Sequence, residues 1–106
     1  QIEDMYITAS SATDIYYLVR KHLHNTEQSK NTMFKLYQLF GILDVTARDC
    51  QDALLLDMKD YEDAVISCCA KRNQMDYIVT RNIKDYEHSK VKVLLPDDFI
   101  RLVSQD

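Results

Sequence analysis

Short apolar runs alternate with segments of helical periodicity along this chain of 106 residues, and this alternation restricts its fold more than any other feature. The runs at 5–9, 42–45, 77–80 and 91–95 predict strands. The intervening periodicity predicts helices at 12–23, from 25 or 26 to 40, at 46–56, at 60–72 and at 96–103. Alternation of this kind is typical of an α/β layer fold, so we expect a parallel sheet covered by helices.

Local signals refine the predicted boundaries. Gly41 is expected to end the second helix, because glycine is favoured just after a helix C-terminus. Thr46, with Asp49 three residues later, is a weakened capping box that opens the third helix. The centre of the run 77–80 is fully apolar, as in a strand covered on both faces.

Composition predicts one small globular domain. Hydrophobic residues make up 46% of the chain and charged residues 28%, with only one Gly and one Pro. No apolar run approaches the roughly 20 residues of a membrane helix, so we expect a cytoplasmic protein with no membrane partner. Cys50, Cys68 and Cys69 lack CxxC spacing, and we expect reduced, small apolar residues on helix faces.

The formal net charge of −4 bears on the function. Proteins that coat nucleic acid by neutralising its phosphates are usually basic, so the charge argues against that class. It does not argue against a metal-dependent nuclease, because a cation held by clustered carboxylates inverts the charge that a phosphate meets.

Acidic and amide side chains occur at two places suited to a metal site. Asp60, Asp63 and Ser67 share one face of the helix predicted at 60–72, and Asp63 is expected at the edge between packed and open surface. Asn82 and Asp85 follow the strand at 77–80, where ligands bind in open α/β sheets. Oxygen donors of this kind suit Mg²⁺ or Mn²⁺. Taken alone, the same residues are also explained as helix caps and turn residues.

The amino-acid sequences of several segments resemble motifs of PIN domains. The chain carries DYEDA at 60–64, DYIVTRNIKDY at 76–86, VLLPDDF at 93–99 and YITASSATDIYY at 6–17. PIN domains carry DFEDA-like and TRNxxDF-like segments at this spacing, a closing strand with a PxxF helix, and a second strand followed by an acidic helix. The resemblance covers nearly the whole chain, and TRNxxDY is its most specific part.

The resemblance implies a three-layer α/β/α fold with a parallel sheet and a metal-dependent ribonuclease site. Asp14 stands where the family commonly has Glu, and Asp63 matches the central helical aspartate. Asn82 and Asp85 match the polar pair after the strand. The implied catalytic set is Asp14, Asp63 and Asp85, with Asn82 as a further ligand of Mg²⁺ or Mn²⁺.

The same motif implies two substrate contacts. Thr80 matches the threonine that orients the polar pair, and Arg81 is placed to meet an RNA phosphate as a bidentate donor. Five other basic residues of the last third gather near the proposed site or form an ordinary solvated surface; they are Lys71, Arg72, Lys84, Lys90 and Lys92.

The chain departs from the family pattern at its start. PIN domains begin with a strand that ends in an aspartate, whereas this chain enters at the stretch before the family's second strand. We therefore expect residues 1–106 to be a single, N-terminally incomplete PIN-like domain of a longer protein, inactive as a fragment, because the sheet would otherwise lack a central strand. The alternatives are that the missing piece comes from elsewhere or that the domain has lost catalysis.

Three functions follow from these observations. The first is hydrolysis of RNA by a metal-activated water, as a toxin-like or RNA-processing nuclease. The second is a catalytically silent PIN-like module that binds RNA or protein, and the third is an unrelated small α/β interaction domain. Many PIN domains are dimeric toxins inhibited by an antitoxin, which implies an antitoxin and a homodimer as partners. Four tyrosines are candidates for such an interface: Tyr16, Tyr17, Tyr37 and Tyr61. Alternatively, they lie at the edge of a core.

Overall fold

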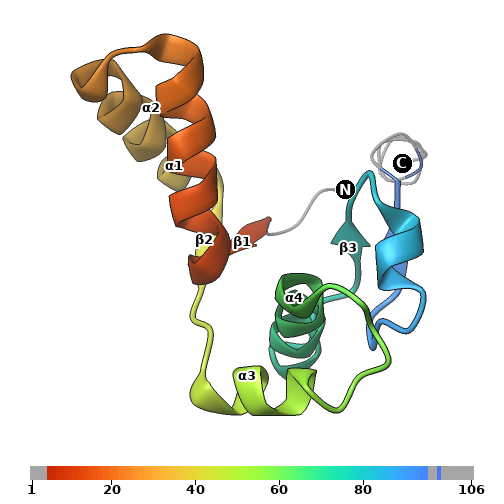
Figure 1. The fold of residues 1–106 in the computed structure, drawn as a ribbon. Helices are drawn as coiled ribbons and strands as arrows, with labels where there is room; N and C mark the ends of the chain where they lie inside the picture. Colours follow the sequence, from red (N-terminus) through yellow and green to blue (C-terminus); the bar gives the residue numbers. More distant parts are fainter. Residues whose placement is uncertain (1–4, 96–97, 99–106) are drawn as a thin grey trace, which may run out of the picture. The chain divides into compact units, whose positions relative to one another are not determined.

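The computed structural model describes residues 5–95 and 98, which fall into two compact units, one up to Asp44 and one from Val45 (Figure 1). Each unit is described by itself. Within the described part of the chain, no helix is both long enough and apolar enough to cross a membrane.

The first unit is a helical hairpin flanked by two short strands. Its elements are β1 (Tyr6–Thr8), α1 (Ala9–Leu23), α2 (Thr26–Leu39) and β2 (Gly41–Leu43). The strands β1 and β2 pair in parallel, with Tyr6 opposite Gly41. At the hairpin turn His24 is left-handed, with φ of 57°, and the Asn25 side chain accepts the backbone N–H of Gln28 at 2.8 Å. The prediction that Asn25 or Thr26 opens the second helix is confirmed.

Gly41 has a different role from the one predicted. The C-cap of α2 is Phe40 in an extended conformation, and Gly41 already belongs to β2. A Cβ atom at Gly41 would lie 2.6 Å from two ring carbons of Tyr6 on the paired strand. The helix thus ends directly before Gly41, as predicted, but Gly41 is not left-handed, and close approach to Tyr6 explains the glycine instead.

The second unit contains two packed helices and a second strand pair. Its elements are α3 (Ala47–Ala53), α4 (Tyr61–Arg72), β3 (Ile78–Val79), the 3₁₀ helix η1 (Ile83–Tyr86) and β4 (Val93–Leu94). The strands β3 and β4 are parallel, and the N–H groups of Ile78 and Thr80 donate to the carbonyls of Lys92 and Leu94 at 2.9 and 3.0 Å. All five elements lie within one unit (Figure 1).

Helix α4 supplies most of the core of the second unit. Ala64, Val65, Cys68 and Cys69 are buried, as the periodicity predicted. Burial raises the pKa of both thiols, Cys68 and Cys69, and the described cysteines are free. One buried cluster joins α4 to Ala53, and another joins it to Ile78, Tyr86 and Val91. The partly buried side chain of Met58 packs against both clusters.

The element order predicted from the sequence is confirmed up to residue 95, with shifted boundaries. Helix α1 begins earlier than expected, at Ala9, and α3 ends at Ala53 rather than at Leu56. Ile78 is buried but Val79 is 43% exposed, so only one face of β3 is covered by described residues. The strands form two separate parallel pairs. The helix predicted at 96–103 lies outside the described residues, apart from 98.

Candidate functional site

The first turn of α4 positions Asp63. Asp60 is the N-cap, and its Oδ1 accepts the backbone N–H of Asp63 at 2.9 Å, which satisfies a donor left open at the helix start. The side chain of Asp63 is half-buried, as predicted for the edge of the packed surface. The hydroxyl of Tyr86 donates to Oδ1 of Asp63 at 2.9 Å. Helix α4 and η1 together therefore hold this carboxylate in place.

The environment disfavours the ionised form of Asp63. Burial raises the pKa of this carboxyl, and the negative charges of Asp60 and Asp85 raise it further, while the hydrogen bond from Tyr86 acts in the opposite direction. Burial and the contact with Asp63 also raise the pKa of Tyr86, so its hydroxyl stays a proton donor. Like charges that act on one carboxylate are relieved when a cation binds.

The turn after β3 positions the polar pair. The hydroxyl oxygen of Thr80 accepts the backbone N–H of Asn82 at 3.1 Å, and the carbonyl of Asn82 accepts the N–H of Asp85 at 3.0 Å. The side chains of Arg81, Asn82 and Asp85 are exposed. The hydroxyl of Thr80 thus contacts the backbone of the turn, and its role in orienting Asn82 and Asp85 stays a prediction.

The predicted site residues are distributed over both units. Asp63, Asn82 and Asp85 belong to the second unit, in which the charge of Asp85 acts on Asp63. Asp14 is an exposed residue of α1 and belongs to the first unit. Ser67 shares a face with Asp63 but is fully buried, because its hydroxyl contacts that of Ser89 at 3.0 Å and accepts the N–H of Lys90 at 2.9 Å.

The donors of the second unit suit a hard divalent cation in kind. Mg²⁺ is usually bound through one or two carboxylates, with water or phosphate oxygens in the other positions. Asp63 and Asp85 supply two carboxylates, and Asn82 supplies an amide oxygen. Among residues 5–95 and 98, no three or more His, Cys, Asp or Glu side chains are grouped so as to hold a metal ion.

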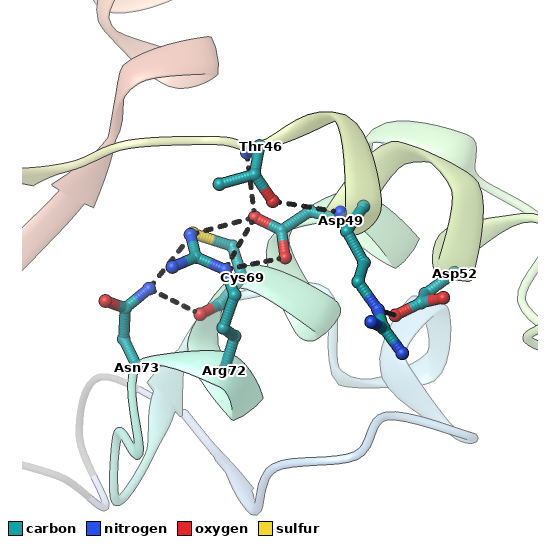
Figure 2. A network of polar contacts seen from close by, with 7 residues as sticks. Thr46, Asp49, Asp52, Cys69, Arg72 and Asn73 are labelled. Atoms are coloured by element: carbon teal, nitrogen blue, oxygen red, sulfur yellow. Dashed lines mark hydrogen bonds and ion pairs between the residues drawn. The ribbon is translucent and has the colours of Figure 1, made fainter.

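A second polar network, which the sequence did not reveal, joins the two helices of the second unit (Figure 2). Asp49 is 2% exposed and accepts hydrogen bonds from the guanidinium of Arg72, from Nε to Oδ1 and from Nη2 to Oδ2, both at 3.0 Å. Thr46 and Asp49 also form a complete capping box, which confirms and strengthens the predicted one. The bond from Arg72 holds the pKa of Asp49 below its ordinary value, despite burial. This pair fastens α3 to the end of α4.

Only weak indications of the contacts made by Tyr86, Asp49 and Arg72 were present in the sequence. Tyr86 stands where the TRNxxDF-like motif has Phe, so an added hydroxyl was visible but its acceptor was not. Asp49 and Arg72 were visible only as a helix cap and a basic residue at a helix end. Their partners lie 23 positions away in each case.

The predicted interface tyrosines have separate surroundings. Tyr16, Tyr17 and Tyr37 line a largely apolar hollow of about 260 Å³ between α1 and α2. Tyr61 instead belongs to the second unit, where its hydroxyl donates to the carbonyl of Cys50 at 2.9 Å.

Comparison with known proteins gives one match. The family model described as the PIN domain matches residues 2–84, which span more than three quarters of the chain and include Asp14, Asp63 and Asn82. Asp85 follows the matched stretch directly. Searches of curated proteins and of solved structures find no significant match.

Proposed function

This chain belongs to the PIN domain family, a nuclease-type family, and from that premise we propose that the full-length protein is a metal-dependent ribonuclease. Its reaction would be hydrolysis of RNA phosphodiester bonds, with Mg²⁺ or Mn²⁺ as cofactor. The observation that carries the proposal is the half-buried carboxylate of Asp63, whose pKa is raised by burial and, to a smaller extent, by the negative charges of Asp60 and Asp85. Carboxyl groups with perturbed pKa values are enriched at functional sites.

The residues of the second unit have separate roles in this proposal. Asp63 and Asp85 would bind the cation, with the amide oxygen of Asn82 as a further ligand. When bound, the cation supplies a water with a lowered pKa and neutralises charge on the phosphate. Tyr86 holds the Asp63 carboxylate through its 2.9 Å hydrogen bond, and Thr80 holds the turn that carries Asn82.

Two further residues complete the proposed set. Arg81 is exposed in the same turn, and its planar guanidinium would donate two hydrogen bonds to a substrate phosphate. Asp14 is proposed as the family's second acidic residue on the resemblance and on its place within the matched stretch. The toxin role, an antitoxin, a homodimer and cytoplasmic localisation are proposed on the resemblance alone.

The direct test is cleavage of a mixed RNA pool by the full-length protein with Mg²⁺, with Mn²⁺ and with EDTA. Cleavage should require the metal, and Asp63→Asn, Asp85→Asn and Asp14→Asn should each lower the rate by about 100-fold or more. Asp57→Asn is the matched control, because the Asp57 side chain is 96% exposed and contacts only His88 in the described region, at 3.6 Å. Cleavage in EDTA, or full activity of Asp63→Asn and Asp85→Asn, would contradict the proposal.

A catalytically silent PIN-like module that binds RNA or a protein is the second candidate function. The observation that favours it is that no group of three or more metal-binding side chains occurs in the described part of the chain. Melting temperature separates the two candidates, because a ligand that binds only the folded state raises it. Millimolar Mg²⁺ or Mn²⁺ should raise the melting temperature of the nuclease but not of its Asp63→Asn variant, and should leave that of a silent module unchanged.

A further inference from the structure

A basic hollow of about 490 Å³ lies in the second unit. Its charged lining consists of Lys71, Arg72, Lys90, Lys92 and Asp76. These residues come from the end of α4 and from the segments that precede β3 and β4. Thr80 to Asp85, in contrast, follow β3. The strands are parallel, so the hollow lies at one end of the strand pair and the proposed metal ligands after β3 lie at the other.

The six basic residues from Lys71 to Lys92 therefore form two groups. Arg81 and Lys84 are in the turn after β3, beside the proposed metal ligands. Lys71, Arg72, Lys90 and Lys92 surround the hollow. Asp63 and Lys71 are eight residues apart on α4, which separates their Cα atoms by about 12 Å along the helix axis.

The backbone that carries Lys90 and Lys92 is held at several points. The N–H of Lys90 donates to the buried hydroxyl of Ser67 at 2.9 Å, and the carbonyl of Lys92 accepts the N–H of Ile78 at 2.9 Å. Between them Val91 is 7% exposed, and its N–H and carbonyl both contact the hydroxyl of Ser89. Val91 is buried, whereas Lys90 and Lys92 on either side of it are exposed.

The hollow has an excess of positive charge. The guanidinium of Arg72 is bonded to Asp49, whereas Lys71, Lys90 and Lys92 form no ion pair with any described residue. Asp76 is the one carboxylate in the lining. Cations at a helix C-terminus are explained by the helix dipole, which accounts for Lys71 and Arg72 but not for Lys90 and Lys92. Two held, adjacent lysines beside a polar hollow suit an anionic ligand.

We infer that this hollow binds a backbone phosphate of the RNA strand at a distance from the bond that is cleaved, an inference that rests on the proposed function. Along α4 the hollow extends from about 6 Å beyond Asp63, at Ser67 to which Lys90 bonds, to about 12 Å, at Lys71, which corresponds to about two to four phosphates at the 3.4 Å axial spacing of a stacked strand. The hollow acts as a second anchor that orients longer substrates. An acidic protein segment is less well supported, because protein interfaces use apolar anchors and this lining is mostly polar.

Equilibrium binding tests the anchor without catalysis. A fluorescent single-stranded RNA of 12 nucleotides is titrated with the full-length protein in EDTA, at several salt concentrations. Lys90→Gln with Lys92→Gln should raise the Kd about tenfold and reduce the slope of log K against log salt by about 1.4, since each phosphate contact on a single strand contributes about 0.7. Lys21→Gln with Lys35→Gln, on α1 and α2, removes the same charge and should change the Kd less than about twofold.

The outcomes separate this inference from the proposed function. In cleavage assays the Lys90 and Lys92 changes should raise KM for long RNA and leave kcat, and the cleavage of a dinucleotide, unchanged. RNA binding that depends on Lys90 and Lys92, without any cleavage, would support the phosphate anchor and contradict the proposed nuclease activity. Metal-dependent cleavage, together with equal changes in the Kd for RNA when Lys90 and Lys92 or the control pair Lys21 and Lys35 are replaced, would contradict the anchor and support the nuclease activity. Stronger competition by hexa-aspartate than by an RNA of equal charge would overturn the anchor in favour of a protein partner.

Discussion

The hydroxyl of Tyr86 donates a 2.9 Å hydrogen bond to Oδ1 of Asp63, across 23 positions of the chain. Tyr86 is 6% exposed, and its ring packs in the buried cluster with Ala70, Ile78 and Val91. The hydrophobic core of the second unit therefore fixes the orientation of the carboxylate that we propose as a metal ligand. The side chain of Tyr86 thus contributes both to core packing, through its ring, and to the proposed metal site, through its hydroxyl.

Tyr86→Phe tests this relationship, because it removes the hydroxyl and keeps the ring. We expect a loss of about 1 kcal/mol in the free energy of unfolding, the usual contribution of one hydrogen bond. The Kd for Mn²⁺ should also rise several-fold, measured by calorimetry, because the Asp63 side chain loses its fixed orientation. Tyr61→Phe is the matched control, since its hydroxyl makes a hydrogen bond of the same length to the carbonyl of Cys50. Equal weakening of Mn²⁺ binding in both variants would argue against a positioning role.

Thr80→Val tests the turn that carries Asn82. The variant keeps the shape of the side chain but removes the oxygen that accepts the N–H of Asn82 at 3.1 Å. We expect cleavage of RNA to fall by about tenfold, the effect of losing about 1.4 kcal/mol of positioning. Thr80→Ser retains the hydroxyl and should retain most of the activity. If both variants behave alike, the hydroxyl does not position the turn.

Stability should fall at acid pH through Asp49. Its pKa in the folded state lies below the ordinary value of 3.8, because Arg72 bonds to the ionised carboxylate. The folded state thus binds this proton less readily than the unfolded state, so the stabilisation is complete above about pH 4 and is lost as the pH falls further. Urea unfolding from pH 6 to pH 3 should show this loss in the wild type and a smaller one in Asp49→Asn.

Asp49→Asn should also lower the stability of the protein at neutral pH. Asp49→Asn should lower the free energy of unfolding by about 2 kcal/mol, since it weakens charged hydrogen bonds to a buried group. Asp52→Asn is the control, because Asp52 forms an exposed pair with Arg48 at 3.6 Å and should change stability by about 0.5 kcal/mol or less. Similar effects of the two substitutions would show that Asp49 and Arg72 do not fasten the helices.

Gly41→Ala tests the close approach between β1 and β2. The added Cβ would lie 2.6 Å from two carbons of the Tyr6 ring, so the ring must move. Tyr6 is 39% exposed and can turn outward, and we therefore expect a modest loss of about 1 kcal/mol in thermal unfolding. In a Tyr6→Ser background the same change should cost clearly less. An equal cost in both backgrounds would place the strain elsewhere.

The features that the sequence predicted correctly depend on interactions between residues close together in the chain. The capping box of Thr46 and Asp49, the cap at Asn25 and the buried face of α4 all depend on residues a few positions apart, and each was predictable. Gly41 shows the limit of local reasoning. A glycine after a helix resembles a C-terminal signal, but here the ring of Tyr6 on the paired strand determines the choice.

The amino-acid sequence by itself determined the order of helices and strands up to residue 95, the family and the candidate acidic residues, because helix periodicity, capping and motif wording are encoded within short segments. Only the tertiary structure decided that Tyr86 bonds to Asp63, that Arg72 bonds to Asp49, and that Lys90 and Lys92 surround a hollow with the end of α4. Such contacts arise when distant segments pack against each other, and no periodicity along the chain records which of the many polar side chains will then meet.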